Sequence, residues 1–294
     1  MILIRHNGFI ECFCHPDLTL VVSSCGGSIY QIRYRGEKML YAPDEQTFLH
    51  PNEEYFGQFV APVAGRIVGG KADGFLLPCN EGNNSLHSGP FATCWKDFAV
   101  ETKENDHSLE VIFTREDSLM GAKYRAESRY VLHDDAPCFD LVMTLEAIDP
   151  CLANVTNHMY FSLGEEAIDG IFIKARTPRV MKYGKGLEPL GFVTAEEALD
   201  LSEGCYLSQC FDHAFEVGGG HVSAISRKAR LEMDTDASGI ILYTDMPSKA
   251  KTGHSAGFTL ETVAHPDMRN LLLRAGEKQC VRASYFFFPN GKNE

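Results

Sequence analysis

Apolar residues recur along the chain in short segments that lack a hydrophobic stripe at helical spacing. Val, Ile, Phe, Tyr and Thr dominate these segments, and Gly, Asn, Asp and Pro separate them, as is typical of strands joined by turns. The pattern predicts strands at Leu18–Ser24, Ser28–Tyr34, Leu109–Thr114, Ala122–His133, Cys138–Ala147, Ile171–Ala175, Leu231–Asp236, Ile240–Asp245, Thr259–Val263 and Cys280–Phe288.

Helices are expected at only two places. Asp44–Phe59 is one, and Thr194–Leu199 is the other, with Thr194 placed as a cap ahead of Glu197. Because strands do not alternate with helices, we expect an antiparallel all-β sandwich or barrel and not a parallel α/β sheet. No linker, repeat or shift in composition divides the chain, so we expect a single domain over residues 1–294.

Composition and charge narrow the possible partners. Hydrophobic residues make up 44% of the 294 residues and charged residues 23%, which is typical of globular proteins. Asp and Glu number 40 against 27 Lys and Arg, a net charge of −13, which argues against nucleic acid and against an anionic membrane surface. No apolar run is long enough to span a bilayer, and polar residues come too early for a secretory signal. We therefore expect a cytoplasmic protein whose 10 cysteines are reduced.

Two segments resemble cofactor motifs without completing them. Gly65–Ala72 nearly has the spacing of a P-loop, but Ala72 stands where Ser or Thr must hold magnesium. Cys12–His15 offers two thiols, but the second ligand pair of a structural zinc site is missing, so an ordinary N-terminal strand is the better interpretation. We expect neither a metal nor a nucleotide cofactor.

Two histidines lie in segments that suit a cleft. His87 sits in the turn-rich polar loop Asn80–Gly89, which either lines a cleft or is a plain surface loop. In the strand-like segment Asn157–Leu163, alternation places His158 on one face with the hydroxyls of Tyr160 and Ser162. That face suits a polar cleft wall, and a buried structural histidine is the alternative.

Three charged residues add candidate chemistry. Glu261 is the one charge in the strand Phe258–Thr262, and burial there would raise its pKa toward that of a general base. The alternative is a solvent-facing Glu on an edge strand. Asp212 could accept hydrogen bonds from a polyol or cap a turn, and Arg66 could donate a fork of hydrogen bonds to a hydroxylated ligand.

These residues fall in motifs that resemble those of the aldose 1-epimerase family, the galactose mutarotases. Asn157–Leu163 is similar to the family's N-H-T-Y-F-N-L strand, and Asn83–Gly89 resembles its N-x-L-H-G-G loop. Asp212–Phe215 resembles D-H-N-F, and Glu261–Thr262 followed by Pro266–Asp267 resembles E-T-Q-x-x-P-D. The motifs occur in the family's order and cover most of the chain.

The resemblance implies a fold, a reaction and a set of roles. The fold would be a β-supersandwich of large antiparallel sheets with few short helices and a sugar bound in an open groove. The reaction would be the cofactor-free interconversion of α and β anomers of an aldose. By resemblance, His158 is the proton donor and Glu261 the proton acceptor. His87, Asp212 and Arg66 would bind the sugar.

The chain departs from the family pattern at three places. Gly65 stands where the family has Asn before the arginine, and Val263 stands where Gln follows Glu-Thr. Asp245–Lys249 replaces the sugar-contacting Q-P-G-x-Q segment and contains no glutamine. The acid–base pair is intact, so these changes bear on which sugar is bound.

Two alternatives to a free-sugar mutarotase are kept open. A hexose-6-phosphate 1-epimerase would use the same chemistry and would need a basic phosphate pocket, for which Lys249, Lys251 and Arg269 are candidates. A non-catalytic sugar-binding or sensor protein could use the same scaffold, because a fold does not determine an activity.

Overall fold

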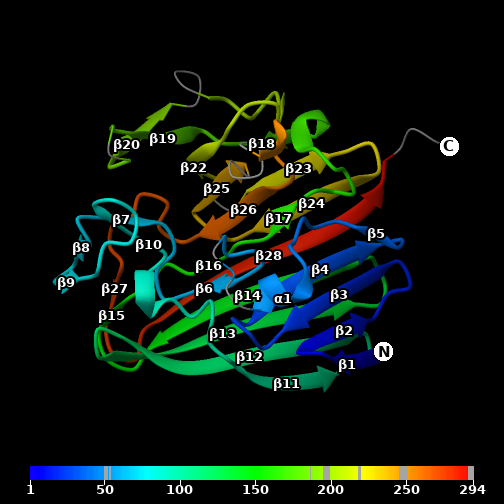
Figure 1. Cartoon of the computed structure of the whole chain (residues 1–294), viewed down its shortest axis with the longest axis horizontal. Coiled ribbons are helices and arrows are strands. Elements are labelled where there is room, and N and C mark those ends of the chain that lie inside the picture. The colour runs from blue at the N-terminus through cyan, green and yellow to red at the C-terminus, as the bar shows by residue number, and fades with distance from the viewer. Residues whose placement is uncertain are drawn as a thin grey trace.

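The structure is a computed structural model that describes residues 1–49, 52, 54–185, 187–194, 199–217, 220–244 and 251–290. Nearly all of its regular structure is β (Figure 1). Helical structure is short and includes α1 (Glu45–Leu49) and the 3-10 turns η1 (Gly89–Phe91) and η2 (Ile168–Gly170). Among the described residues, no helix is both long and apolar enough to cross a membrane.

The largest sheet has nine antiparallel strands, and the C-terminal strand β28 runs through its middle (Figure 1). In spatial order they are β11 (Ala99–Glu104), β12 (Ser108–Leu119), β13 (Ala122–His133), β14 (Cys138–Ala147), β28 (Lys278–Pro289), β24 (Ala229–Thr235), β23 (His221–Ile225), β18 (Phe172–Ala175) and β21 (Cys205–Tyr206). Met120 and Gly121 both have positive φ, 52° and 91°, and so make the tight turn that joins the long strands β12 and β13.

The described residues also form two smaller sheets and four strand pairs. The five-stranded sheet contains β1 (Ile2–His6), β2 (Phe9–Phe13), β3 (Leu18–Ser23), β4 (Ser28–Tyr34) and β5 (Glu37–Lys38). The six-stranded sheet runs β17 (Tyr160–Phe161), β26 (Phe258–Val263), β25 (Gly239–Thr244), β22 (Asp212–Glu216), β19 (Arg179–Tyr183) and β20 (Pro189–Thr194). The pairs are β6 (Phe59–Val60) with β16 (Thr156–Asn157), β7 (Arg66–Val68) with β10 (Asn84–Leu86), β8 (Lys71–Ala72) with β9 (Phe75–Leu76), and β15 (Cys151–Leu152) with β27 (Leu272–Leu273).

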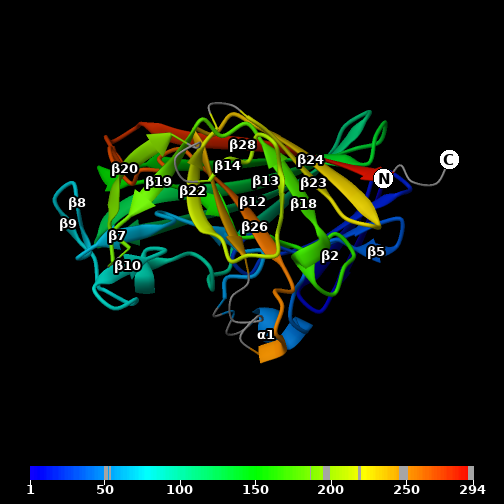
Figure 2. The same cartoon turned by 90° about the horizontal axis from the view of Figure 1, so that it is seen from above.

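In Figure 2 the long strands of the large sheet lie across the upper part of the view, and α1 lies below them. Aromatic side chains of β28 contact both smaller sheets. Tyr285 stacks on Phe139 of β14 with ring centroids 4.9 Å apart, and it lies 5.8 Å from Phe161 of β17. Phe287, two residues along the strand and hence on the same face, stacks on Tyr34 of β4 at 5.9 Å. The arrangement is a two-layer β-supersandwich, which confirms the predicted fold class.

Polar contacts fix the middle of the sandwich next to His158. The carbonyl of Gly27 accepts hydrogen bonds from Ser128 Oγ at 2.9 Å and from Tyr130 Oη at 3.1 Å. Asn157 Nδ2 in turn donates to Tyr130 Oη at 3.3 Å. The backbone just before His158 is therefore tied to the large sheet by a buried network.

The ten strands predicted from the hydrophobic pattern each coincide with an observed strand, apart from end residues, and Asp245 lies outside the described residues. The helix prediction for Asp44–Phe59 is correct only for Glu45–Leu49 and is wrong for its last residues, because Tyr55 and Gly57 have positive φ values of 59° and 62° and Phe59 belongs to β6. Residues 50, 51 and 53 lie outside the described residues. Thr194 ends strand β20, and residues 195–198 of the helix predicted at Thr194–Leu199 lie outside the described residues. All 10 cysteines are unpaired, as predicted.

Phe161 provides a test of the sandwich core. Its ring is fully buried between Phe258 and Tyr285, so Phe161→Ala should lower the free energy of unfolding by about 3–5 kcal/mol in a denaturant titration. Leu76→Ala is the control, because Leu76 is 60% exposed and its loss should change that free energy by less than about 0.5 kcal/mol. Equal effects of the two changes would contradict the packing described.

Candidate active site

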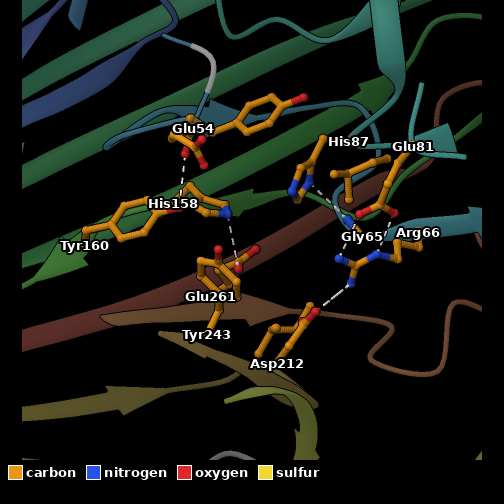
Figure 3. A pocket seen from close by; sticks show the side chains of 13 residues that line it. Glu54, Gly65, Arg66, Glu81, His87, His158, Tyr160, Asp212, Tyr243 and Glu261 are labelled. Carbon is orange, nitrogen blue, oxygen red and sulfur yellow. Dashed lines mark hydrogen bonds and ion pairs between the residues drawn. The ribbon is translucent and has the colours of Figure 1, made fainter. Parts of the chain in front are cut away.

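A cavity of about 500 Å³ opens where β7, β10, β17, β22, β25 and β26 approach one another (Figure 3). It contains all five residues predicted from the sequence as catalytic or sugar-binding. The lining residues are Glu54, Tyr55, Gly65, Arg66, Glu81, Leu86, His87, His158, Tyr160, Asp212, Ile241, Tyr243 and Glu261. Residues from six strands and from loops far apart in the sequence therefore meet in one place.

His158 and Glu261 form a buried pair at this cavity (Figure 3). His158 lies in the gap between β16 and β17, where its backbone N–H donates to the carbonyl of Gln58 at 2.9 Å. Glu261 lies on β26, which has β17 on one side and β25 on the other in the six-stranded sheet. His158 Nε2 is 3.4 Å from Glu261 Oε1, and the two residues are 6% and 3% exposed. The edge-strand alternative for Glu261 is therefore wrong.

The prediction that Asn157–Leu163 is one continuous strand needs correction. The segment is split between β16 and β17, and Leu163 has a positive φ of 47°. His158 and Tyr160 both line the cavity, as expected, but Ser162 lies in a different depression. The alternation holds only as far as the short strand β17 extends, because two-residue periodicity requires an unbroken extended backbone.

Burial shifts the pKa values of the pair in opposite directions. Loss of hydration, helped by the nearby Asp212 carboxylate, raises the pKa of Glu261 to about 8, although Thr259 Oγ1 donates to Glu261 Oε1 at 3.2 Å and opposes the shift. The same loss of hydration lowers the pKa of His158 to about 4. The rise for Glu261 confirms the direction predicted from the sequence. Between these two values the pair holds one proton, which either partner can carry.

His87 presents a hydrogen-bond donor to the cavity. The backbone N–H of Gly65 donates to His87 Nδ1 at 3.2 Å, and burial holds the pKa of His87 well below its usual value. A neutral imidazole that accepts at Nδ1 carries its proton on Nε2, so Nε2 donates. Gly65 has a φ of 89°, and a Cβ there would lie 2.8 Å from Met268 Sδ. A side chain at residue 65 would therefore require the Met268 side chain to move.

Arg66 is held between two carboxylates (Figure 3). Its Nε donates to Glu81 Oε2 at 2.7 Å and its Nη2 to Glu81 Oε1 at 3.0 Å. Its Nη1 lies 3.2 Å from Asp212 Oδ2 at the start of β22. Asp212 therefore faces the cavity, whereas the adjacent His213 lines a different one.

Several lining residues were missed in the sequence analysis. Tyr55 lies 4.7 Å from the ring of His87 and 5.9 Å from that of His158, and it falls in the segment where a helix was expected. Glu81 lies in the polar loop that was noted only for His87, and nothing in its spacing reveals Arg66 as its partner. Tyr243 could have been found, because it shares a face of β25 with Ile241, which pairs with Glu261.

His87, His158 and Glu261 also have the composition of a metal site. One ligand atom from each lies within 4.8 Å of the others. However, His87 accepts the Gly65 N–H at Nδ1, so its Nε2 carries a proton and offers no lone pair to a metal ion. The trio suits the binding of hydroxyl groups better than the binding of a metal.

The remaining positions singled out in the sequence lie away from this cavity or outside the described residues. Val263 is buried at the end of β26 and does not line the cavity. Lys251 does not line it either, and Arg269 borders a separate depression. Asp245–Lys249, which includes the phosphate candidate Lys249, lies outside the described residues.

Solved structures of similar fold cover the chain almost end to end. A galactose 1-epimerase from Lactobacillus acidophilus superposes with a TM-score of 0.87 at 18% identity, covering 98% of both chains. An aldose epimerase homologue from C. elegans gives a TM-score of 0.84 at 19% identity, covering 97% of this chain and 99% of that one. At these identities the likeness shows the fold.

Sequence comparison identifies relatives and a family. An aldose 1-epimerase from Streptococcus thermophilus is 26% identical over 64% of this chain, and the bifunctional protein gal10 from Schizosaccharomyces pombe is 23% identical over 61%. The chain spans 59% of the length of the first relative and 28% of the second. The aldose 1-epimerase family model matches residues 12–278, nearly the whole chain. The protein thus belongs to the aldose 1-epimerase family.

Proposed function

We propose that this protein interconverts the α and β anomers of an aldose by opening and reclosing the sugar ring, with no metal or nucleotide cofactor. The observation that carries the proposal is the buried contact of 3.4 Å between His158 Nε2 and Glu261 Oε1 in a cavity lined by hydrogen-bonding groups. General acid–base catalysis requires an acid and a base that lie side by side and have shifted pKa values. Here the pKa of the carboxyl is raised and the pKa of the imidazole is lowered.

In the proposed mechanism Glu261 takes the proton of the O1 hydroxyl while His158 gives a proton to the ring oxygen O5. The O1–H electron pair forms the C1=O1 double bond, and the C1–O5 bond breaks with its electron pair moving to O5. Rotation about C1–C2 then presents the other face of the aldehyde. Reclosure returns both protons with the two roles exchanged, so the pair ends with the proton number with which it began.

The proton balance of the pair supports this cycle. With pKa values of about 8 for Glu261 and about 4 for His158, the resting pair holds its single proton on the carboxyl at neutral pH. The short contact lets that proton pass to the imidazole, which gives the form that the ring-opening step needs. No net charge is gained or lost in the pair, so the buried site avoids the cost of an unpaired charge.

We assign the sugar hydroxyls to His87, Asp212 and Arg66. His87 supplies an N–H donor, Asp212 supplies acceptor oxygens, and Arg66 supplies the N–H groups that the two carboxylates leave over. The wall therefore offers both hydrogen-bond donors and hydrogen-bond acceptors, which suits a polyol, because each of its hydroxyl groups can both donate and accept.

A hexose 6-phosphate fits this cavity less well than a free sugar. Among the described lining residues, Arg66 is the sole cation, and it is already engaged by Glu81 and Asp212. Glu54 adds another carboxylate to the wall. A phosphate dianion would face this excess of negative charge. A sugar-binding protein without activity remains the second candidate, and turnover distinguishes it.

The acid–base roles are tested by Glu261→Gln and His158→Asn. Glu261→Gln is nearly isosteric, and His158→Asn puts a smaller polar group in place of the imidazole. Each change removes a proton-transfer group, so kcat for a confirmed aldose should fall at least about 100-fold with little change in KM. Polarimetry on fresh α-glucose and α-galactose gives the rates. Wild-type turnover in either variant would remove that residue from its role, and an inactive wild type that binds sugar would favour the sensor.

The pH profile is tested on the wild type. Above about pH 8 the pair loses its proton and the acid is missing, and below about pH 4 both groups are protonated and the base is missing. The value of kcat/KM should therefore be high between these limits and fall on both sides. A profile that rises continuously from pH 6 to pH 10 would contradict a shared proton.

The binding roles are tested by His87→Ala and Asp212→Ala. Each should raise KM by about 10- to 100-fold, the effect of losing one or two hydrogen bonds to a buried polar group, with a smaller change in kcat. His213→Ala is the matched control, because His213 adjoins Asp212 in the sequence but lines another cavity. An Asp212 variant that behaves like the His213 variant would take Asp212 out of the site.

A further inference from the structure

Glu81 makes a contact with Arg66 that no motif of the sequence predicts. Both of its carboxylate oxygens accept from the guanidinium, at 2.7 Å from Nε and 3.0 Å from Nη2. Such a two-point contact fixes the plane of the guanidinium as well as its position. Arg66 and Glu81 are both partly shielded from solvent, with side chains 23% and 33% exposed.

The backbone holds Glu81 and Arg66 on one rigid unit. Glu81 and Asn84 exchange backbone hydrogen bonds of 3.1 Å and 2.8 Å, and Asn84 begins β10. Strand β10 pairs with β7 in a register that places Leu86 opposite Arg66. The loop that carries Glu81 is therefore fastened to the strand that carries Arg66, and His87 follows directly on the same strand end.

Arg66 is also the cation whose charge reaches the acid–base pair. Glu261 is surrounded by two imidazoles, His158 at 3.4 Å and His87 within the same 4.8 Å cluster. Its other polar neighbours are the hydroxyl of Thr259 and the phenols of Tyr160, Tyr183 and Tyr243. The charged groups near it are Asp212 and Arg66. Asp212 raises the pKa of Glu261 and Arg66 lowers it. Whatever neutralises Arg66 therefore helps Glu261 keep its proton at neutral pH.

We propose that Glu81 is a positioning residue for the reaction. Its carboxylate accepts hydrogen bonds from two nitrogens of Arg66 and so orients the guanidinium toward the sugar. It also balances the charge of Arg66 beside the Glu261–His158 pair. This inference rests on the proposed function. It assigns Glu81 two separable effects, one on sugar binding through geometry and one on proton transfer through charge.

Three variants separate the two effects. Glu81→Gln keeps the shape and removes the charge, so the fall of kcat/KM at high pH should begin on the order of half a pH unit lower than in the wild type. Glu81→Asp keeps the charge and shortens the reach, so KM should rise several-fold while the high-pH limb stays in place. Glu81→Ala removes both and should show both changes.

Glu216→Gln is the matched control. Glu216 forms the same two-point contact with Arg179 and lies on β22 with Asp212, but it does not line the cavity. Its variant should leave KM and the pH profile unchanged. Thermal unfolding of all four variants separates a folding defect from an effect on the site, and Glu81→Gln, which is nearly isosteric, keeps the test open if Glu81→Ala does not fold.

The outcomes are distinct. The proposal is supported if the fall of kcat/KM at high pH begins at a lower pH in Glu81→Gln and at the wild-type pH in Glu81→Asp. An unchanged limb in Glu81→Gln, or an equal loss of kcat at every pH in all three Glu81 variants, overturns it. If the wild type changes the anomeric ratio of no aldose, the proposed function fails instead, irrespective of what the Glu81 variants do.

Discussion

Glu261 lies on β26, where all 6 side chains are buried, and a carboxyl group in such a place has lost nearly all of its hydration. Its ionised form can exist there only if a neighbour takes or shares the proton. His158 is that neighbour, and its own burial makes the imidazolium equally costly. Each group is unfavourable when charged alone, so at neutral pH the pair rests uncharged with its one proton on Glu261. The surroundings of the cavity serve to keep these two side chains together and away from bulk water.

The sandwich supplies the rigidity that this pair needs. His158 falls in a gap between two short strands, a place where a backbone could move, but its N–H is bonded to Gln58 and the preceding Asn157 is tied through Tyr130 to the large sheet. Three residues further on, Phe161 packs against Tyr285 of β28. His158 is thus fixed on both sides by contacts to the nine-stranded sheet, whereas Glu261 is fixed on the buried strand β26 of the six-stranded one, where it pairs with Ile241.

The strands were predictable because their signal is local: alternating side chains and turn residues lie within a few positions of one another. The motifs around His87, His158, Asp212, Arg66 and Glu261 were visible for the same reason. The helix expected at Asp44–Phe59 failed at its C-terminal end, because the pairing of Phe59 with Asn157 and the positive φ values of Tyr55 and Gly57 override local preference. Glu81 was missed because its importance lies in a contact to Arg66 across a hairpin, and Tyr55 because it enters the cavity from a loop.

Three charged residues, Glu81, Arg66 and Asp212, lie next to the Glu261–His158 pair and affect where its proton is held. Glu81 and Asp212 both form ion pairs with Arg66. The two carboxylates balance its positive charge, so this charge does not force Glu261 to ionise. A bare arginine at the same place would lower the pKa of Glu261 and leave His158 without a proton to give. An arginine whose N–H groups were all occupied by carboxylates could not donate a hydrogen bond to a sugar. Two carboxylates on one guanidinium satisfy both needs, because the five N–H groups of arginine exceed the number that the carboxylates use. In the proposed mechanism, sugar recognition and proton placement are therefore coupled through the side chain of Arg66.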